Sequence, residues 1–218
     1  MGNISNKATQ VYTPLTLKLY DWWVLGISNN YAWYCPTREN LLPHFLQNLS
    51  LNHLDIGVGT GYYLAEAPAN CNISLMDLNS ASLNSASARV GEARIRNKFQ
   101  HDAFKAYPES LHEKFDSVSM FYLIHCLPGP MTDKSIVVQH AKKALTNTGV
   151  LYGATILGDG VKHNYFAAKL MHIYNRKGIF SNYNDSEDEL ERILSDHFEN
   201  INITVKGTVA LFSASGKR

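Results

Sequence analysis

The chain has 218 residues, of which 45% are hydrophobic and 18% charged, and its formal net charge is +1. This length and composition are typical of one globular domain with a sizeable core. A net charge near zero argues against a broad phosphate-binding surface, so we expect no nucleic-acid partner. The cysteines Cys35, Cys71 and Cys126 form no CxxC pair, and we therefore expect neither disulfides nor a metal site.

The chain contains no apolar run long enough to span a bilayer, and no hydrophobic signal core follows Met1. We therefore expect a cytoplasmic protein with no membrane partner. Residues 1–50 are rich in tyrosine and tryptophan and are interrupted by Pro36 and Pro43. We interpret this segment as a helical N-terminal cap.

From residue 51 onwards, short apolar runs typical of strands alternate with segments typical of helices. Asn79 is a suitable N-cap for one of these helices, and Gly149 is a suitable stop after another. Such alternation predicts a mainly parallel sheet with helices on both faces. The expected strands are residues 53–56, 73–76, 98–101, 115–121 and 150–156, and the expected helices are residues 62–67, 80–93 and 132–145.

The last third of the chain has a different pattern, with two helices expected over residues 163–176 and 187–197. Two strand-like runs, residues 201–205 and 208–212, then flank Lys206-Gly207, which is a hairpin signal. Together, the expected strands and helices predict a doubly wound, Rossmann-like α/β fold. Its seven-stranded sheet would be mainly parallel and would finish with a C-terminal antiparallel hairpin.

Three glycines, Gly57, Gly59 and Gly61, lie between the first expected strand and the helix after it. Glycine permits a tight turn and a close approach of the backbone to a ligand. A dinucleotide fingerprint would need its last glycine at position 62, where this chain has Tyr62. The Asp55 carboxylate before the turn would repel a pyrophosphate, whereas it would suit a ligand that carries an ammonium group.

The run Asp55-Ile56-Gly57-Val58-Gly59-Thr60-Gly61 resembles motif I of the class I S-adenosylmethionine-dependent methyltransferases. The resemblance extends over about residues 51–215. It implies that Asp77, at the end of the second strand, accepts hydrogen bonds from ribose hydroxyls. Leu78 would pack on the adenine, and Asp102 in the loop with Ala103 would accept from the adenine amino group. We also expect Tyr20 and Phe121 to contact the cofactor.

Methyl transfer from a sulfonium is an in-line displacement, which needs a general base only for a nucleophile whose proton has a high pKa. The residues after the fourth expected strand should lie near the methyl group, because ligands bind at the carboxyl ends of parallel strands. His125 is our candidate general base, and Tyr122 is an alternative polar contact.

The acceptor is expected to be a small molecule, bound between two helical caps. Aromatic and apolar residues of both caps suggest an apolar or aromatic acceptor, although the same spacing is consistent with core packing. We expect one methyltransferase domain, made of the cap, a cofactor-binding core (51–158), a helical insertion (159–198) and the hairpin (199–218), acting as a monomer or homodimer. The candidate acceptor-binding residues are Trp33, Tyr34, Tyr165, Phe166 and Met171.

Two other readings stay open. A nicotinamide-dependent oxidoreductase would share the first strand, the turn and the acid at the second strand, but Asp55, Tyr62 and the hairpin argue against it. The second alternative is that the same fold binds the cofactor without transferring a methyl group, as a pericyclase-like catalyst or as a partner-binding subunit.

Overall fold

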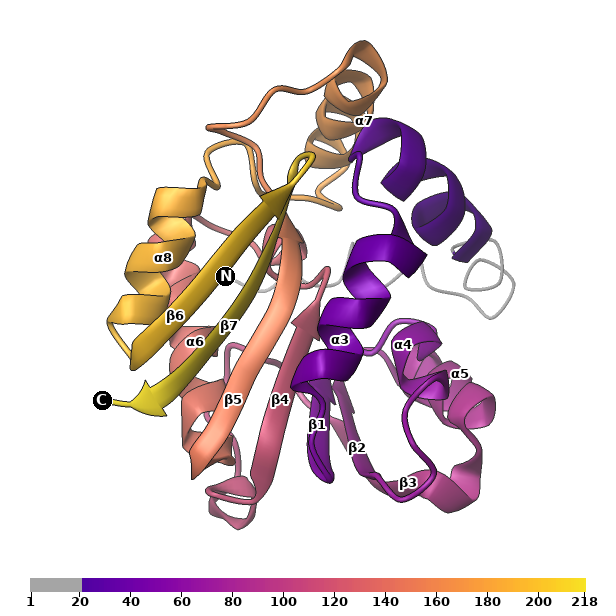
Figure 1. The fold of residues 1–218 in the computed structure, drawn as a ribbon, viewed down its shortest axis with the longest axis vertical. Coiled ribbons are helices and arrows are strands. Elements are labelled where there is room, and N and C mark those ends of the chain that lie inside the picture. The colour runs from indigo at the N-terminus through magenta and orange to yellow at the C-terminus, as the bar shows by residue number, and fades with distance from the viewer. Residues whose placement is uncertain (1–20) are drawn as a thin grey trace.

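A computed structural model describes residues 21–218 of the chain (Figure 1). Tyr20, which we expect to contact the cofactor, lies outside the described residues.

The centre of the fold is a seven-stranded sheet with the order β3-β2-β1-β4-β5-β7-β6. Strands β1 to β5 pair in parallel, and β7 pairs antiparallel with both β5 and β6. This topology confirms the mainly parallel sheet with a C-terminal antiparallel hairpin. The strands are β1 (Asn52–Ile56), β2 (Asn72–Asp77), β3 (Ile95–Gln100), β4 (Phe115–Phe121), β5 (Leu145–Ile156), β6 (Phe198–Lys206) and β7 (Val209–Lys217).

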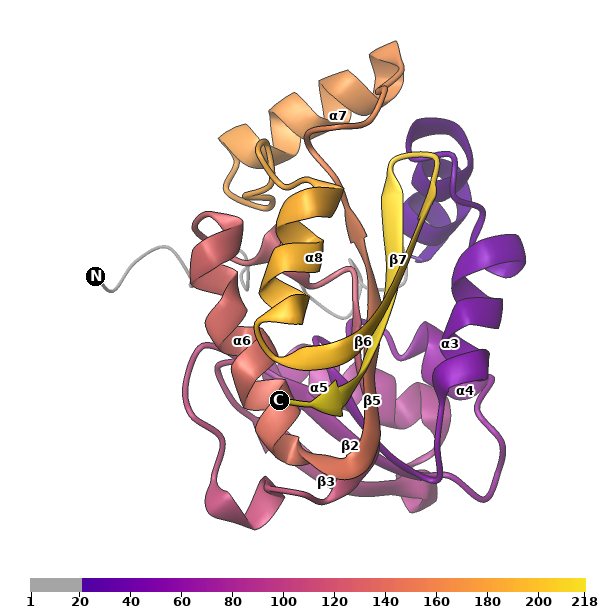
Figure 2. The same ribbon diagram turned by 60° about the vertical axis from the view of Figure 1, so that its left-hand side comes forward.

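Helices cover both faces of this sheet, as Figure 2 shows. Helices α3 (Leu42–Asn48), α4 (Tyr62–Ala65) and α5 (Ser80–Val90) pack on one face through a first hydrophobic cluster. Helices α6 (Met131–Ala144) and α8 (Glu187–Ser195) pack on the other face through a second cluster. Side chains alternate along a strand, so β2, β4 and β5 contribute to both clusters, whereas β1 contributes Leu54 and Ile56 to the second cluster and buries His53 and Asp55 on the other face.

Above the carboxyl ends of the strands, the N-terminal helical segments lie beside α7 (Tyr165–Arg176), as Figure 1 shows. Trp23 of η1 (Asp21–Ala32) donates through Nε1 to the Tyr174 hydroxyl at 2.9 Å and packs edge-on against Phe166. The segment η2 (Thr37–Leu41) then leads into α3. The short turns η3 (Glu92–Arg94), η4 (Glu109–Leu111) and η5 (Ile124–Cys126) complete the described helical elements.

Several boundaries differ from the expectation, among them the starts of β3 and β5. Strand β3 begins at Ile95, three residues before its expected start, although it carries little apolar content. Strand β5 follows α6 directly, so Gly149 does not end a helix. Instead it lies where the pairing shifts from Phe115↔Leu145 to Ser117↔Val150. A Cβ at Gly149 would lie 3.0 Å from the Phe115 carbonyl oxygen, so the bulge needs glycine for close approach.

Candidate active site

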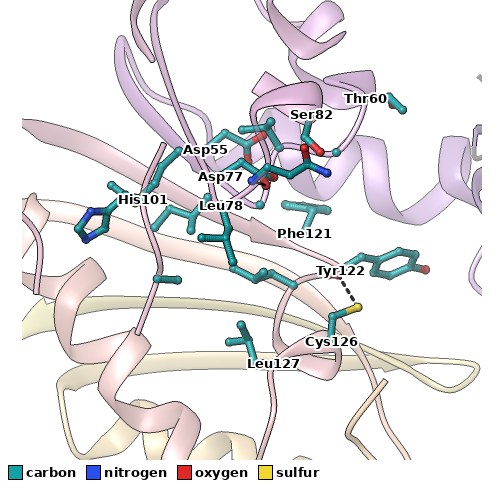
Figure 3. A pocket seen from close by; sticks show the side chains of 18 of the residues that line it. Asp55, Thr60, Asp77, Leu78, Ser82, His101, Phe121, Tyr122, Cys126 and Leu127 are labelled. Atoms are coloured by element: carbon teal, nitrogen blue, oxygen red, sulfur yellow. Dashed lines mark hydrogen bonds between the residues drawn. The ribbon is translucent and has the colours of Figure 1, made fainter. Parts of the chain in front are cut away.

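A cavity of about 230 Å³ opens at the carboxyl ends of β1, β2 and β4, where the loops after these strands converge (Figure 3). This is the edge where open parallel sheets bind their ligands. Its described lining consists of residues 55–60, 62–63, 76–79, 82, 101–104, 121–123 and 126–128, together with Leu25 and Ile179.

The glycine loop supplies one wall, and its three glycines have different functions. Gly57 (φ 76°) and Gly59 (φ 51°) line the cavity in the left-handed conformation that favours glycine. A Cβ on Gly59 would meet nothing within 4 Å, which leaves room for a ligand against the backbone. Gly61 (φ 70°) does not line the cavity. A Cβ there would lie 2.8 Å from the Ala86 Cα in α5, so this glycine lets two helices pack closely.

Asp77 ends β2 beside this loop. Its carboxylate accepts from the Asn79 backbone N–H at 2.8 Å and from the N–H groups of Val58 and Gly59. Burial raises the pKa of Asp77 to about 6, against the opposing effect of these donors. The carboxylate therefore connects the end of β2 to the glycine loop while it borders the cavity.

Asp55 lies next to Asp77 in Figure 3 and is buried at the end of β1. The Ser119 hydroxyl of β4 donates a hydrogen bond to Asp55 Oδ1. Burial raises the pKa of Asp55 to about 7, Ser119 opposes this rise, and the nearby Asp77 carboxylate adds to it. The cavity therefore holds two close carboxyl groups that would each gain from a positive or donating ligand group.

The loop after β3 completes the acidic half of the cavity. Asp102 and Ala103 line it, and Asp102 Oδ1 accepts from the Phe104 N–H at 3.0 Å, which fixes the turn. Leu78 is 38% exposed and offers an apolar surface beside the cavity. None of the lining residues described is lysine or arginine. Three carboxylates without a cation suit a neutral or positively charged ligand and disfavour a pyrophosphate.

The other half of the cavity is apolar. Phe121 at the end of β4, Leu123 and Leu127 after it, Leu25 of η1 and Ile179 after α7 line this half. Figure 3 shows Phe121 and Leu127 on opposite sides of the space.

Tyr122 also lines this half, with φ at 57°. Its hydroxyl donates to Asn29 Oδ1 at 2.8 Å, so the phenol is directed towards η1. Cys126 lies 3.6 Å through Sγ from the Tyr122 carbonyl oxygen, and burial raises the pKa of its thiol to about 12. The thiol is therefore neutral and a poor nucleophile.

His125 does not line the cavity. The Ile156 backbone N–H donates to its Nδ1 at 3.2 Å, and the ring packs edge-on against Phe180 at 4.5 Å between centroids. Burial lowers the pKa of His125 to about 3. A general base needs access to the proton it removes, and this ring instead joins η5 to β5. The placement thus corrects the expected position of His125 at the reacting atoms.

The sequence is similar to those of known proteins. A family model for a methyltransferase domain matches residues 54–151. The chain is 62% identical to YbcY of Escherichia coli (strain K12) over 89% of this chain and 100% of that protein. It is 43% identical to the physcion biosynthesis cluster O-methyltransferase of Aspergillus chevalieri, over 96% and 95% of the two chains. The chain belongs to the class I S-adenosylmethionine-dependent methyltransferases.

A solved structure agrees with this assignment at the level of the fold. The N-methyltransferase NodS of Bradyrhizobium japonicum WM9, in complex with S-adenosyl-L-homocysteine, superposes with a TM-score of 0.65. It is 14% identical and covers 97% of this methyltransferase and 100% of its own chain. The cofactor is S-adenosylmethionine, and the acidic half of the cavity, with free space against Gly59, fits its positive charge and its ribose.

The expected acceptor-binding residues of the methyltransferase do not line the cavity described here. Trp33 is buried against Phe180, and Met171 is buried in the first hydrophobic cluster. Tyr34 and Tyr165 are 55% and 84% exposed on the surface. Phe166 packs against Trp23 of the cap. Trp33, Phe166 and Met171 therefore pack within the fold, in keeping with the core-packing alternative, whereas Tyr34 and Tyr165 face solvent.

Sequence reasoning named Phe121 and Tyr122 but missed the other side chains that line the apolar half. The stretch after β4 was expected near the methyl group, and it contributes Leu123 and Leu127 rather than His125. Leu25 and Ile179 gave no signal in the sequence, because each is one apolar residue in a helical or loop segment.

Among residues 21–218, no helix is long and apolar enough to cross a membrane, and no three His, Cys, Asp or Glu side chains are grouped to hold a metal ion.

Proposed function

We propose that this methyltransferase transfers the methyl group of S-adenosylmethionine to a small apolar or aromatic acceptor by in-line displacement. The observation that carries the proposal is one continuous cavity with an acidic half and an apolar half. The Aspergillus relative is an O-methyltransferase by name, which makes oxygen the first acceptor atom to test. We further propose a single cytoplasmic domain that acts as a monomer or homodimer.

In this proposal the acidic half holds the cofactor. Asp55 meets its ammonium end, and Asp77 accepts from the ribose hydroxyls. The backbone at Gly57 and Gly59 allows close approach, while Leu78, Asp102 and Ala103 surround the adenine. When bound, the cofactor supplies a methyl group on a sulfonium sulfur, which is a good leaving group.

The apolar half has the task of holding the acceptor in line and excluding water. Phe121 and Leu123 form walls of fixed shape, because they lie on or directly after the central strand β4, and Leu127 follows the η5 turn. Alignment and water exclusion account for a large part of the rate enhancement in displacements of this kind. The proposal gives no proton transfer to His125.

The test has two stages. Calorimetry with S-adenosylhomocysteine and with NAD separates the methyltransferase from the oxidoreductase, and we expect binding of S-adenosylhomocysteine alone. Transfer of radiolabelled methyl groups is then measured over a panel of phenols, amines and carboxylic acids, with Asp77→Asn as the control. We expect labelled phenols from the wild type and at least ~10-fold less from the variant, for a lost charged hydrogen bond.

Two results would contradict the proposal. Tight NAD binding without S-adenosylhomocysteine binding would support the oxidoreductase interpretation instead. Cofactor binding without transfer to any member of the panel would favour the catalyst or subunit that does not methylate.

A further inference from the structure

Four buried polar side chains lie on one face of the sheet between β1 and β4. The parallel register places His53 opposite Ser117 and Asp55 opposite Ser119. All four lie among the apolar side chains that pack against α3. Polar groups in such a place destabilise a fold unless they are hydrogen-bonded, so their partners indicate what the cluster does.

The hydrogen bonds among these groups run in one direction. The Ser119 hydroxyl donates to Asp55 Oδ1, and because a hydroxyl has one hydrogen, its oxygen must accept from His53 Nε2 at 3.0 Å. Burial lowers the pKa of His53 to about 3, so the ring is neutral and carries one N–H. That N–H is therefore on Nε2, and Nδ1 accepts from the Ser117 hydroxyl at 2.9 Å.

The far end of the chain of hydrogen bonds begins in the backbone. The Ser50 N–H donates to the Ser117 Oγ at 3.0 Å, which leaves the Ser117 hydrogen available to His53 Nδ1. Each group from Ser50 to Ser119 thus donates towards the next, and the last proton points at the Asp55 carboxylate. The arrangement is self-consistent only while Asp55 is an acceptor.

We propose that His53 is a positioning residue that acts through Ser119 to keep Asp55 an ionised acceptor for the positive end of the cofactor. The inference rests on the proposed function, in which Asp55 meets the cofactor ammonium group. A short line of hydrogen bonds, the His53–Ser119 relay, would then set the preference of the cavity for a cation although neither residue lines it.

The groups around Asp55 explain why its carboxylate needs a hydrogen-bond donor. Burial and the Asp77 carboxylate of β2 both raise its pKa, whereas Ser119 of β4 lowers it. From β5, the buried Tyr152 hydroxyl faces it with its own pKa raised, and therefore neutral. His44 of α3 packs on Tyr152 with a lowered pKa, and the pKa of Cys71 is raised. No group named here is a cation, and the Ser119 hydrogen bond is the interaction that lowers the pKa of Asp55 against burial and Asp77.

A purely structural role for His53 makes a different prediction. The ring packs against Phe45 and Tyr152 at 5.7 and 5.9 Å between centroids, so its loss would lower stability in any case. Such a loss would weaken all ligands of the cavity alike. The relay instead affects only a ligand that carries the ammonium group.

The experiment compares S-adenosylhomocysteine with methylthioadenosine, which keeps the adenine and ribose but lacks the amino-acid end. The ratio of their dissociation constants, measured by calorimetry from pH 5.5 to 9, isolates Asp55 from the ribose contact at Asp77. The variants are Ser119→Ala, His53→Asn and His53→Gln. His44→Asn is the matched control, because His44 packs on the same aromatic cluster but bonds to the Phe212 carbonyl oxygen.

In the wild type we expect the preference for S-adenosylhomocysteine to increase as the pH rises through about 7. Ser119→Ala and His53→Asn should reduce that preference about 5- to 10-fold at pH 7 and move its midpoint to higher pH. His53→Gln, whose amide nitrogen can reach the position of Nε2, should behave nearly as the wild type. His44→Asn should leave the ratio unchanged.

Equal weakening of both ligands in His53→Asn, or an unchanged ratio in both relay variants, would overturn the relay and leave the proposed function standing. A wild type that binds neither ligand would overturn both. Circular dichroism verifies that each variant is folded. If His53→Asn does not fold, Ser119→Cys tests the same link, because a thiol of similar size is a weak donor.

Discussion

The buried carboxylates of Asp55 and Asp77 lower the stability of the folded protein when they are ionised. Burial favours the protonated form of each, so the folded protein binds these protons more tightly than the unfolded chain does. The free energy of unfolding of the ligand-free protein should therefore fall as the pH rises from about 4, the usual range of an aspartate, through the raised values. A bound positive ligand would offset this loss, which couples stability to cofactor binding.

Asp55→Asn tests, at a single residue, whether the ionised carboxylate lowers stability while it favours cofactor binding. The amide cannot ionise, and its oxygen can still accept from Ser119. At pH 8 the ligand-free variant should be more stable than the wild type by about 2 kcal/mol. This is less than the roughly 4 kcal/mol that the whole pKa shift implies, because Asp55 borders the cavity and keeps some contact with water.

Urea unfolding at pH 5 and pH 8 measures the effect. The advantage of the variant should be small at pH 5 and should grow towards pH 8, while its affinity for S-adenosylhomocysteine falls at least ~10-fold. A variant less stable than the wild type at pH 8 would show that the Asp55 carboxylate does not strain the empty cavity.

At the scale of elements, the loop between β1 and α4 has two contacts that glycine makes possible, one with α5 and one with the cavity. Gly61→Ala would force a methyl group against the backbone of α5 in addition to the strain of a positive φ. We expect about 3 kcal/mol of lost stability, with the affinity of the remaining folded protein for S-adenosylhomocysteine little changed.

Gly59→Ala is the matched variant in the same loop. Its φ is also positive, but its Cβ would enter open space, so the loss of stability should be only about 1 kcal/mol. The methyl group would occupy space beside the cavity, and affinity for S-adenosylhomocysteine should fall clearly. Thermal unfolding and calorimetry on both variants should give opposite rankings. The same ranking in both measurements would contradict the assignment of Gly61 to helix packing and of Gly59 to the cavity.

Much of this element structure could be predicted from the sequence. The apolar run of β4 matches the expected strand, and Asn79 caps α5 by accepting from the Ala81 N–H at 2.9 Å, as expected. Strand β3 was harder, because an edge strand with exposed side chains has a weak apolar pattern. Its first residues pair with β2 through the backbone, which sequence periodicity does not report.

At the scale of the whole molecule, one buried ion pair among the described residues joins α6 to the segment between α7 and α8. Lys134 of α6 contacts Asp185 Oδ2 at 2.6 Å and donates to the Ser181 carbonyl oxygen at 2.7 Å. Burial lowers the pKa of Lys134 and raises that of Asp185, so each charge depends on the other. This pair fixes the loop after α7, which brings Ile179 to the apolar half of the cavity.

Breaking the pair from one side should therefore be costly. Lys134→Met leaves a buried carboxyl without its partner, and we expect a loss of about 3–5 kcal/mol, or roughly a 10 °C lower melting temperature. The double variant Lys134→Met/Asp185→Leu should recover most of that loss. Calorimetric melting curves measure both, and a double variant no more stable than the single one would argue against charge burial as the cause.

The candidate site divides into a predictable and an unpredictable part at this same scale. Asp55 and Asp77 lie at the carboxyl ends of β1 and β2, and Asp102 follows β3, so topology alone brings them to one edge. Whether a residue after β4 faces the cavity depends instead on the turn it enters. The left-handed backbone at Tyr122 and the η5 turn direct His125 into the core, which no pattern of residue types encodes.

The reversed hairpin has a consequence for biosynthesis. Strand β7 lies between β5 and β6, so the fifth strand has no second neighbour until residues 209–217 have left the ribosome. A nascent chain that stops earlier exposes the N–H and C=O groups of a long apolar strand, which other chains can pair with. Premature termination between Ile156 and Val209 should therefore yield an aggregating product rather than a smaller enzyme, although every residue of the glycine loop has already been made.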